Sequence, residues 1–218
     1  MTDVTDLLPA LGLRVRAGDL ELRGITDDLV AELAGLAARG VHPPEFMPFT
    51  SPWTDTPAED FGRTFAQYHW RTRAEFSTAS WSLNLAVLHR GEVVGVQGVG
   101  TADFLVTRTG ETGSWLGLAH QGKGLGTAMR QVMCAFLFDH LDFTQITSGA
   151  FTDNPASLTL SAKVGYVANG TVRHSRRAEQ ADMAMLVLTP EAFRRGPHAL
   201  EVEGVQAFRH SIGLSSEV

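Results

Sequence analysis

Three glycines stand at alternate positions, Gly122, Gly124 and Gly126, directly before a long segment with one apolar face. Glycine costs conformational order in any regular element, so three of them in a short stretch need a physical reason. The N–H groups in the first turn of a helix have no partners, and an anion can reach them where no Cβ atom stands in the way. The spacing therefore predicts a cradle for a phosphate or pyrophosphate group, with a plain tight turn as the alternative.

Two common phosphate-binding loops have different spacings. The stretch HQGKGLGTAM, residues 120–129, lacks the Gly-x-x-x-x-Gly-Lys-Ser/Thr pattern of a P-loop. It follows a predicted antiparallel hairpin late in the chain, whereas the dinucleotide-binding pattern G-x-G-x-x-G belongs to a first βαβ unit. A nucleotide-binding protein of the Walker type would also need a lysine and an acidic metal ligand, and neither is found in the right sequence context.

A second group of residues follows after one predicted strand. Asn154 before Pro155 is typical of a helix N-cap, and Lys163 with Gly165 is typical of a helix C-terminus. Each of these residues has an ordinary structural interpretation when it is taken alone. The order of the two groups, with a single strand between them, is the more specific observation.

The two groups together resemble the GNAT acyltransferases, which transfer an acyl group from coenzyme A to an amine. The residues that match the two family motifs are Gln121, Gly124 and Gly126, then Asn154, Lys163, Gly165 and Tyr166. The order of the predicted elements agrees over residues 20–189. Within the family, Trp115 and Ser157 resemble the RimJ and RimL branch of ribosomal-protein N-terminal acetyltransferases, and the whole chain is similar to a succinyl-CoA transferase of this type.

The resemblance implies a CoA thioester, either succinyl-CoA or acetyl-CoA, as the co-substrate, and no metal. It implies that the pantetheine arm pairs with the backbone of residues 116–118, that the glycine loop binds the pyrophosphate, and that a backbone N–H near Leu118 binds the oxyanion. The residues implied in CoA binding are Leu116, Gly117, Leu118, Gln121, Gly122, Lys123, Gly124, Leu125, Gly126, Thr127, Asn154 and Ser157.

The resemblance also implies direct attack of the amine on the thioester in a ternary complex, without a covalent intermediate. Many GNAT enzymes have a tyrosine acid seven residues after the motif asparagine, but this chain has Ser161 there. We therefore expect Ser157 to assist the departing thiolate, with Ser161 as the second choice. Glu111 is the candidate base for the amine proton, and its alternative interpretation is a solvated carboxylate at a strand edge. His120 at the loop entrance is an alternative base, for which a surface or capping role is commoner.

A proline-rich segment, residues 42–55, could form a wall of the acyl pocket or could pack its aromatic rings onto the core. The candidate acyl-pocket residues are His42, Phe46, Phe49, Trp53 and Gln97. A succinyl carboxylate needs hydrogen-bond donors once it leaves water, and several of these side chains could supply them. We favour a succinyl donor on this basis, whereas acetyl-CoA is the donor if these residues only pack a loop.

Hydrophobic periodicity predicts an α/β protein with a single mixed, mostly antiparallel sheet and helices on both faces. Predicted helices cover residues 26–40, 56–76, 125–137 and 154–165, and predicted strands cover residues 20–25, 81–87, 93–100, 110–118, 144–151, 166–173 and 181–189. The GNAT resemblance implies that the fourth and fifth strands splay apart. We expect one domain over residues 1–218 with its core at about 20–190, and a tail, residues 196–218, that is helical or serves as an oligomer arm in a homo-oligomer.

Composition excludes several classes of function. The net charge is −6, which argues against general nucleic-acid binding, and the single cysteine excludes a multi-cysteine zinc site. The longest strongly apolar run, VMCAFLF, is too short to span a membrane, and the acidic N-terminus is not a secretory signal, so we expect a cytoplasmic protein. The acceptor could be a protein N-terminus, a lysine or a small amine. A GNAT-like protein that binds acyl-CoA without turnover is a further alternative.

Overall fold

The computed structural model describes residues 3–215 and contains nine strands and seven α-helices. The strands are β1 (Arg14–Ala17), β2 (Leu20–Gly24), β3 (Ser80–His89), β4 (Glu92–Ala102), β5 (Thr109–Leu116), β6 (Gln145–Phe151), β7 (Val167–Arg176), β8 (Glu179–Leu188) and β9 (Glu201–Glu203). The helices are α1 (Val4–Leu7), α2 (Asp27–Ala38), α3 (Ala58–Ala74), α4 (Phe104–Thr107), α5 (Leu125–His140), α6 (Pro155–Val164) and α7 (Val205–Ser211).

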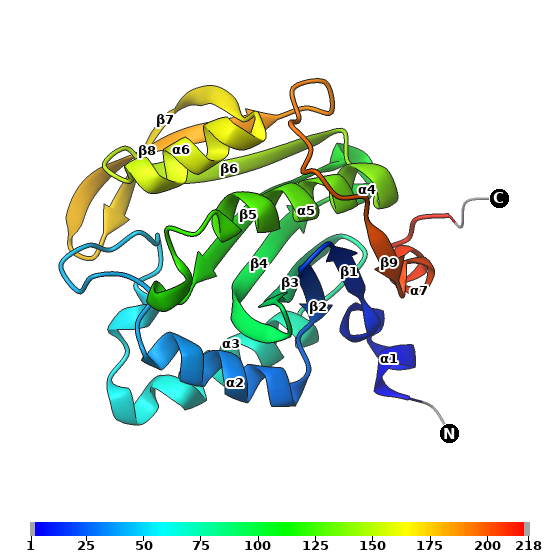
Figure 1. Cartoon of the computed structure of the whole chain (residues 1–218), viewed down its shortest axis with the longest axis horizontal. Helices are drawn as coiled ribbons and strands as arrows, with labels where there is room; N and C mark the ends of the chain where they lie inside the picture. Colours follow the sequence, from blue (N-terminus) through cyan, green and yellow to red (C-terminus); the bar gives the residue numbers. More distant parts are fainter. Residues whose placement is uncertain (1–2, 216–218) are drawn as a thin grey trace.

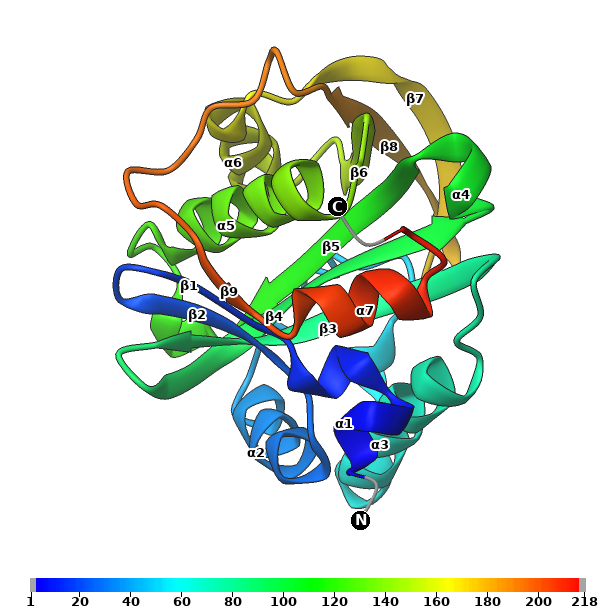
Figure 2. The same cartoon turned by 90° about the vertical axis from the view of Figure 1, so that its right-hand side faces the viewer.

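All nine strands form one sheet in the order β7-β8-β6-β5-β4-β3-β2-β1-β9 (Figure 1). Every neighbouring pair is antiparallel except β5 and β6, which are parallel because α5 carries the chain back across the sheet. Helices α5 and α6 lie on one side of the strands and α2 and α3 on the other (Figure 2). The predicted α/β architecture, mixed and mostly antiparallel with helices on both faces, is confirmed.

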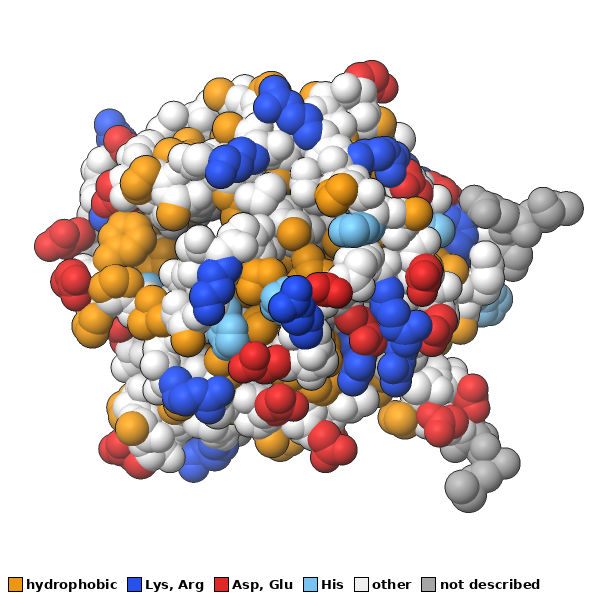
Figure 3. All heavy atoms as spheres, in the orientation of Figure 1, with side chains coloured by type: hydrophobic (Ala, Val, Ile, Leu, Met, Phe, Trp, Pro, Cys, Tyr) orange, Lys and Arg blue, Asp and Glu red, His pale blue; other side chains and the backbone are white. Residues whose placement is uncertain are grey.

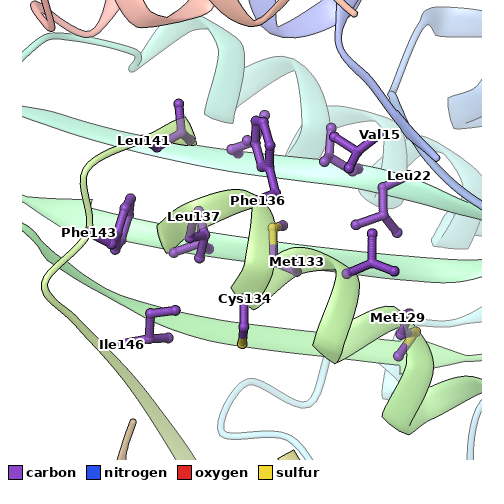
Figure 4. Packing of buried hydrophobic residues seen from close by; sticks show 14 of the residues in the cluster. Val15, Leu22, Met129, Met133, Cys134, Phe136, Leu137, Leu141, Phe143 and Ile146 are labelled. Carbon is purple, nitrogen blue, oxygen red and sulfur yellow. The ribbon is translucent and has the colours of Figure 1, made fainter. Parts of the chain in front are cut away.

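The main core lies under α5, whose sequence repeats apolar residues at helical spacing. Met133, Phe136 and Leu137 are fully buried and belong to one hydrophobic cluster with Val15 and Leu22 from the first two strands (Figure 4). Burying each side chain of this size contributes roughly 1.5–3 kcal/mol. This packing fixes α5 on the sheet, and with it the glycine loop that precedes the helix.

Strands β5 and β6 pair over only three residues, from Thr109 opposite Gln145 to Glu111 opposite Thr147. Beyond that last pair, β5 continues to Leu116 and β6 to Phe151 without pairing with each other. We call residues 112–116 of β5 and residues 148–151 of β6 the splay. These strands are the fourth and fifth of those predicted from the sequence, so the predicted opening is present.

The sheet and core extend beyond the expected core of residues 20–190 at both ends. Strand β1 pairs with β9, which leads into α7 (Figure 2). Helix α7 buries Phe208 against Trp81, with ring centroids 5.6 Å apart. Within residues 196–215, the tail expected to be helical or an oligomer arm therefore forms a strand and a helix of the chain's own core, and residues 216–218 lie outside the described part of the chain. In the described part of the chain, no helix has both the length and the apolar character needed to cross a membrane.

Candidate active site

The glycine loop leaves open space in front of the first turn of α5. Gly122 and Gly124 have φ angles of +73° and +81°, in the left-handed region, and no atom lies within 4 Å of a Cβ placed on either residue. No side chain caps α5, so the N–H groups of its first turn point into this space. The Lys123 ammonium folds back to the Ala119 carbonyl at 2.7 Å. Backbone groups therefore dominate this surface.

Gly126 differs from the other two glycines. A Cβ on this residue would lie 2.8 Å from the Leu160 side chain of α6. The missing side chain thus lets α6 pack closely on the first turn of α5. This packing holds the start of α6, with Asn154 and Ser157, beside the glycine loop.

Gln121 ties the loop to the rest of the molecule. Its side-chain amide donates to the carbonyl of Leu116 at 2.8 Å and to that of Val41 at 2.7 Å. The Leu118 N–H donates to the Gly40 carbonyl at 3.0 Å, and the Gly117 N–H donates to the Val94 carbonyl at 3.0 Å. We expected a backbone N–H near Leu118 to bind the oxyanion and residues 116–118 to pair with the pantetheine arm. This expectation is wrong for two N–H groups, because that of Gly117 already bonds to β4 and that of Leu118 bonds to Gly40 after α2.

The backbone groups that remain free lie one step earlier in β5. Residues of an antiparallel ladder alternate between bonding to one neighbour and facing the other side. Because Gly117 bonds to β4, the same register turns the backbone of Trp115 toward β4 and the N–H groups of Ser114 and Leu116 toward β6. They have no strand partner within the splay.

Strand β6 presents free backbone in the same way. The Thr152 N–H donates to the Asp182 carbonyl of β8 at 2.9 Å, and the register alternates from that pair. The backbone of Gly149 and the N–H of Phe151 consequently face β5. An extended chain with amide groups could thus bond to both edges of the splay.

The start of α6 holds the two candidate serines. Asn154 caps the helix, because its Oδ1 accepts from the Ser157 N–H at 3.1 Å. The Ser157 side chain is half-buried, whereas Ser161 is 1% exposed and its hydroxyl has no hydrogen-bond partner. The two side chains share one helix face, one turn apart. Only Ser157 is open to a bound molecule.

Glu111 occupies the last paired position of β5 and is exposed. Its Oε1 lies 3.7 Å from the position of a Cβ on Gly149, so the carboxylate reaches across to β6. Side chains alternate along a strand, and those of Glu111 and Trp115 therefore face α3 while that of Ser114 faces α5. The candidate base thus lies at the closed end of the splay, on the side opposite α5.

The expected acyl-pocket residues fall into two separate places. Phe49, Trp53 and Trp115 form an aromatic cluster with α3 on one face of the sheet, with the Trp53 ring centroid 5.3 Å from Phe49 and 5.7 Å from Trp115. His42 lies beside Phe49 at 5.7 Å, and Phe46 is half-buried in the same segment. We name Phe49, Trp53, Phe61, Phe65 and Trp115 the aromatic cluster.

Two of the donors expected to bind a succinyl carboxylate, His42 and Gln97, are already engaged. The His42 Nδ1–H donates to the Pro43 carbonyl at 2.8 Å, and Nε2 lies 2.7 Å from the Thr54 hydroxyl. Gln97 is fully buried on the opposite face of the sheet, where its amide donates to the Gly113 carbonyl at 3.1 Å. Placing Gln97 in the same wall as His42 and Trp53 was wrong, because the strand pleat turns it toward α5.

The proline-rich segment is held by the turn between β7 and β8. Arg177 makes a bidentate ion pair with Asp55 at 2.8 and 2.9 Å and donates to the Pro44 carbonyl at 3.0 Å. This hydrogen bonding lowers the pKa of the Asp55 carboxyl. The β7–β8 turn and the proline-rich segment therefore meet on the side of the sheet that carries the aromatic cluster.

A buried arginine, missed in the sequence analysis, lies at the closed end of the splay. Arg130 of α5 is 4% exposed. Its guanidinium donates to Gln97 Oε1 at 3.3 Å, Thr112 Oγ1 at 3.3 Å, Ser148 Oγ at 3.2 Å and Ser114 Oγ at 3.0 Å. The sequence held a signal for this site, because Arg130 lies four residues from both Gly126 and Cys134 in the apolar stripe of α5.

Two further polar groups adjoin this arginine. The Tyr166 hydroxyl lies 2.9 Å from Thr112 Oγ1 and 3.5 Å from Cys134 Sγ. Burial raises the pKa of Tyr166 well above its usual range and raises the pKa of the Cys134 thiol to about 11. Both groups are therefore protonated at neutral pH, and the fully buried Cys134 belongs to the core.

A separate groove lies away from the splay. It measures about 750 Å³ and separates α5 from the β1–β2 hairpin and residues 195–200, where Figure 3 shows a hollow with a hydrophobic floor. Its lining includes His89, His140 and His198, but no residue of the splay. Among residues 3–215, no group of three or more His, Cys, Asp or Glu side chains could hold a metal ion.

A family model described as an acetyltransferase (GNAT) domain matches residues 19–167. The chain belongs to the GNAT acetyltransferase family. The resemblance inferred from the two motifs is thereby confirmed at the level of the family. The match covers the glycine loop, both strands of the splay and the capped start of α6.

Solved structures of other GNAT proteins share the fold. RimJ from Mycobacterium smegmatis in complex with CoA-disulfide is 19% identical, with a TM-score of 0.64 over 83% of this chain and 86% of that one. Ribosomal-protein-S5-alanine acetyltransferase from Vibrio fischeri is 16% identical, with a TM-score of 0.63 over 81% and 96%. A spermidine N-acetyltransferase chimera from Vibrio cholerae and hSSAT is 13% identical, with a TM-score of 0.61 over 79% and 96%.

GNAT proteins use CoA thioesters and amines, so this chain is an acyl-CoA N-acyltransferase by family. The neighbours named above include one that acts on a ribosomal protein and one that acts on a polyamine. At such low identity the likeness extends to the fold alone, and it names neither the acyl group nor the acceptor. Those two properties must come from the side chains of this GNAT protein.

Proposed function

We propose that this protein transfers a short acyl group from a CoA thioester to an amine by direct attack within the splay. The observation that carries the proposal is the presence of free backbone groups in two places, at the glycine loop and along the two unpaired strand edges. The open first turn of α5 suits a pyrophosphate, because its N–H groups and the helix dipole both favour an anion. The unpaired edges of β5 and β6 suit the two amides of a pantetheine arm.

The free N–H groups of Ser114 and Leu116 take the role that we first expected near Leu118. A thioester carbonyl that accepts from one of them would become a stabilised oxyanion when the amine attacks. Glu111 then accepts the amine proton, directly or through water, from the face that carries the aromatic cluster. Ser157 donates a hydrogen bond to the departing thiolate. This assignment keeps donor and acceptor on opposite faces of the sheet, so both can be bound at once.

For the acyl group, we propose succinyl in preference to acetyl. The closed end of the splay is polar, since Thr112, Ser114 and Ser148 all turn their hydroxyls toward Arg130. An acetyl methyl group gains little from such surroundings, whereas a carboxylate needs them. Acetyl-CoA remains the alternative donor, in agreement with the acetyltransferase neighbours.

For the acceptor, the ribosomal-protein acetyltransferase among the neighbours makes a protein N-terminus the first class to test, before lysines and small amines. The test incubates the purified protein with acetyl- or succinyl-CoA and a panel of these amines, and follows the release of free thiol. Amine-dependent thiol release supports the proposal. Tight CoA binding by calorimetry without any release would instead favour a GNAT protein that binds acyl-CoA without turnover.

A further inference from the structure

Arg130 carries a buried positive charge without a carboxylate beside it. Among residues 3–215, none of the ion pairs includes it, and its four hydrogen-bond acceptors are neutral hydroxyl and amide oxygens. Arg209 is the other buried arginine among residues 3–215, and its guanidinium pairs with the Asp142 carboxylate. A buried charge is costly unless an opposite charge compensates it. This imbalance marks Arg130 as a site for an anion.

The position of Arg130 decides which anion can reach it. Its partners come from β4 (Gln97), β5 (Thr112 and Ser114) and β6 (Ser148), so the guanidinium spans the point where β5 and β6 separate. Ser114 contributes both its hydroxyl to Arg130 and its free N–H to the splay. A thioester carbonyl bound at that N–H would therefore lie one side chain away from the guanidinium.

We infer that Arg130 binds the terminal carboxylate of a dicarboxylic acyl group, of which succinyl is the example, carried on CoA. This inference rests on the proposed function, because it assumes that the thioester lies in the splay. It assigns the choice of acyl group to a residue that touches the acyl end and not the shared CoA body.

The hydrogen-bond count of Arg130 supports this role. A guanidinium has five N–H groups, and the four bonds use one on Nε, two on Nη1 and one on Nη2. The remaining N–H is on Nη2, the atom bonded to Ser114. The hydroxyls of Thr112 and Ser148 already donate to the carbonyls of Thr147 and Thr112, both at 3.2 Å. The Ser114 hydroxyl accepts from Arg130 and can rotate to donate to a carboxylate, so Ser114 and the remaining N–H of Nη2 would together complete the carboxylate site.

The test compares affinities by calorimetry for succinyl-CoA, butyryl-CoA and free CoA. Butyryl-CoA is the matched ligand, because it has the same four acyl carbons and no carboxylate. The wild-type protein should bind succinyl-CoA at least about tenfold more tightly than butyryl-CoA, since a hydrogen-bonded charge pair is lost in the second ligand. Equal affinities in the wild type would overturn the inference without any variant.

Arg130→Met, which keeps a long side chain and removes the charge, should reduce the preference for succinyl- over butyryl-CoA to less than about twofold while the affinity for free CoA is unchanged. Arg130→Lys, which keeps the charge, should retain part of the preference. If Arg130→Met weakens all three ligands equally, the arginine only braces the strands and the inference is wrong. Failure of the wild type to bind any CoA form would contradict the proposed function itself, which is a different result.

Discussion

The two sides of the sheet at the splay present different chemical groups, backbone N–H groups on one side and aromatic side chains on the other. On the α5 side, the glycine loop and the strand edges offer backbone N–H groups, and Gly122 and Gly124 keep side chains away from them. On the α3 side, the aromatic cluster joins side chains from the proline-rich segment, α3 and β5. A surface of backbone groups can bind what all CoA thioesters share. Side chains must carry what is particular to this chain, namely the aromatic cluster on the α3 side and Arg130 beside the backbone surface on the α5 side.

This difference predicts which changes affect every donor and which affect only one substrate. Damage to the backbone surface should weaken all CoA forms together. Substitutions on the aromatic face should leave CoA affinity unchanged and should alter the stability of the protein or its binding of the acceptor. The four predictions below follow this division, from the largest expected effect to the smallest.

The largest effect is expected at the glycine loop. Gly124→Leu should weaken binding of free CoA about 100-fold, because the new side chain would occupy the space before the first turn of α5 and remove hydrogen bonds to a charged group. Calorimetry with free CoA measures this loss. Unchanged affinity in Gly124→Leu would contradict the cradle.

Gly91→Leu is the matched control for this variant. Gly91 lies in the turn between β3 and β4 with a φ of +84°, close to the +81° of Gly124, and it also has no atom within 4 Å of its Cβ position. Both substitutions therefore impose similar backbone strain. Gly91→Leu should be destabilised to the same extent as Gly124→Leu and should bind CoA as the wild type does.

A pH-dependent loss of stability is expected on the aromatic face. Burial, and secondarily the charge of Arg73, lowers the pKa of His69 on α3 to about 4. In the unfolded chain His69 binds a proton near pH 6.5, whereas in the folded protein it stays neutral down to about pH 4. The stability that neutral His69 provides is therefore complete above pH 6.5 and is lost as the pH falls toward 4. Between pH 7.5 and 5 the free energy of unfolding should fall by about 2 kcal/mol through this residue.

His69→Phe isolates that contribution. Phenylalanine keeps a ring against Phe65, whose centroid lies 4.9 Å from that of His69, and cannot titrate. Urea titrations at pH 7.5 and 5 should show a smaller loss of stability in the variant than in the wild type by this amount. CoA affinity at pH 7.5 should be unchanged. An identical pH dependence in the two proteins would show that His69 is not the group responsible.

The two serines of α6 provide a smaller and sharper comparison. Ser157→Ala should lower kcat about tenfold with little change in the KM for the donor, the pattern of a contact made in the transition state. Ser161→Ala should leave kcat unchanged and raise stability slightly, because it removes a buried hydroxyl that has no partner. Steady-state kinetics and thermal melts measure both. A larger loss of kcat in Ser161→Ala would reverse the two assignments.

The smallest effect is expected where the β7–β8 turn meets the proline-rich segment. Asp55→Asn removes the charge that Arg177 binds and should change the KM for the acceptor by roughly two- to fivefold, since both groups are partly exposed. The KM for the donor should not change. Asp153→Asn is the control, because it breaks the equally short pair with Arg176 away from that segment. Equal effects of the two variants would argue against a role of this contact in acceptor binding.

The sequence predicted the elements that follow from local periodicity and turn chemistry. Helix α5 could be read from apolar residues at helical spacing after the glycines, and α6 from the cap at Asn154 and the glycine stop at Gly165. Strands β1 and β9 could not, because four and three residues carry too little periodicity. Strand β1 is held between β2 and β9, and β9 forms only by pairing with β1, which lies far away in the sequence.

The sequence by itself thus determined the family, the glycine loop and the order of the elements around the splay, since these depend on residues close together in the chain. The tertiary structure decided which N–H groups are free, because those of Gly117 and Leu118 are taken by residues far away in sequence. It also placed the Gln97 side chain beside Arg130 on the other face of the sheet, and not in the expected acyl pocket. The role of a buried charge depends on the groups around it. For Arg130 these groups come from three strands, β4, β5 and β6, that only the folded sheet brings together.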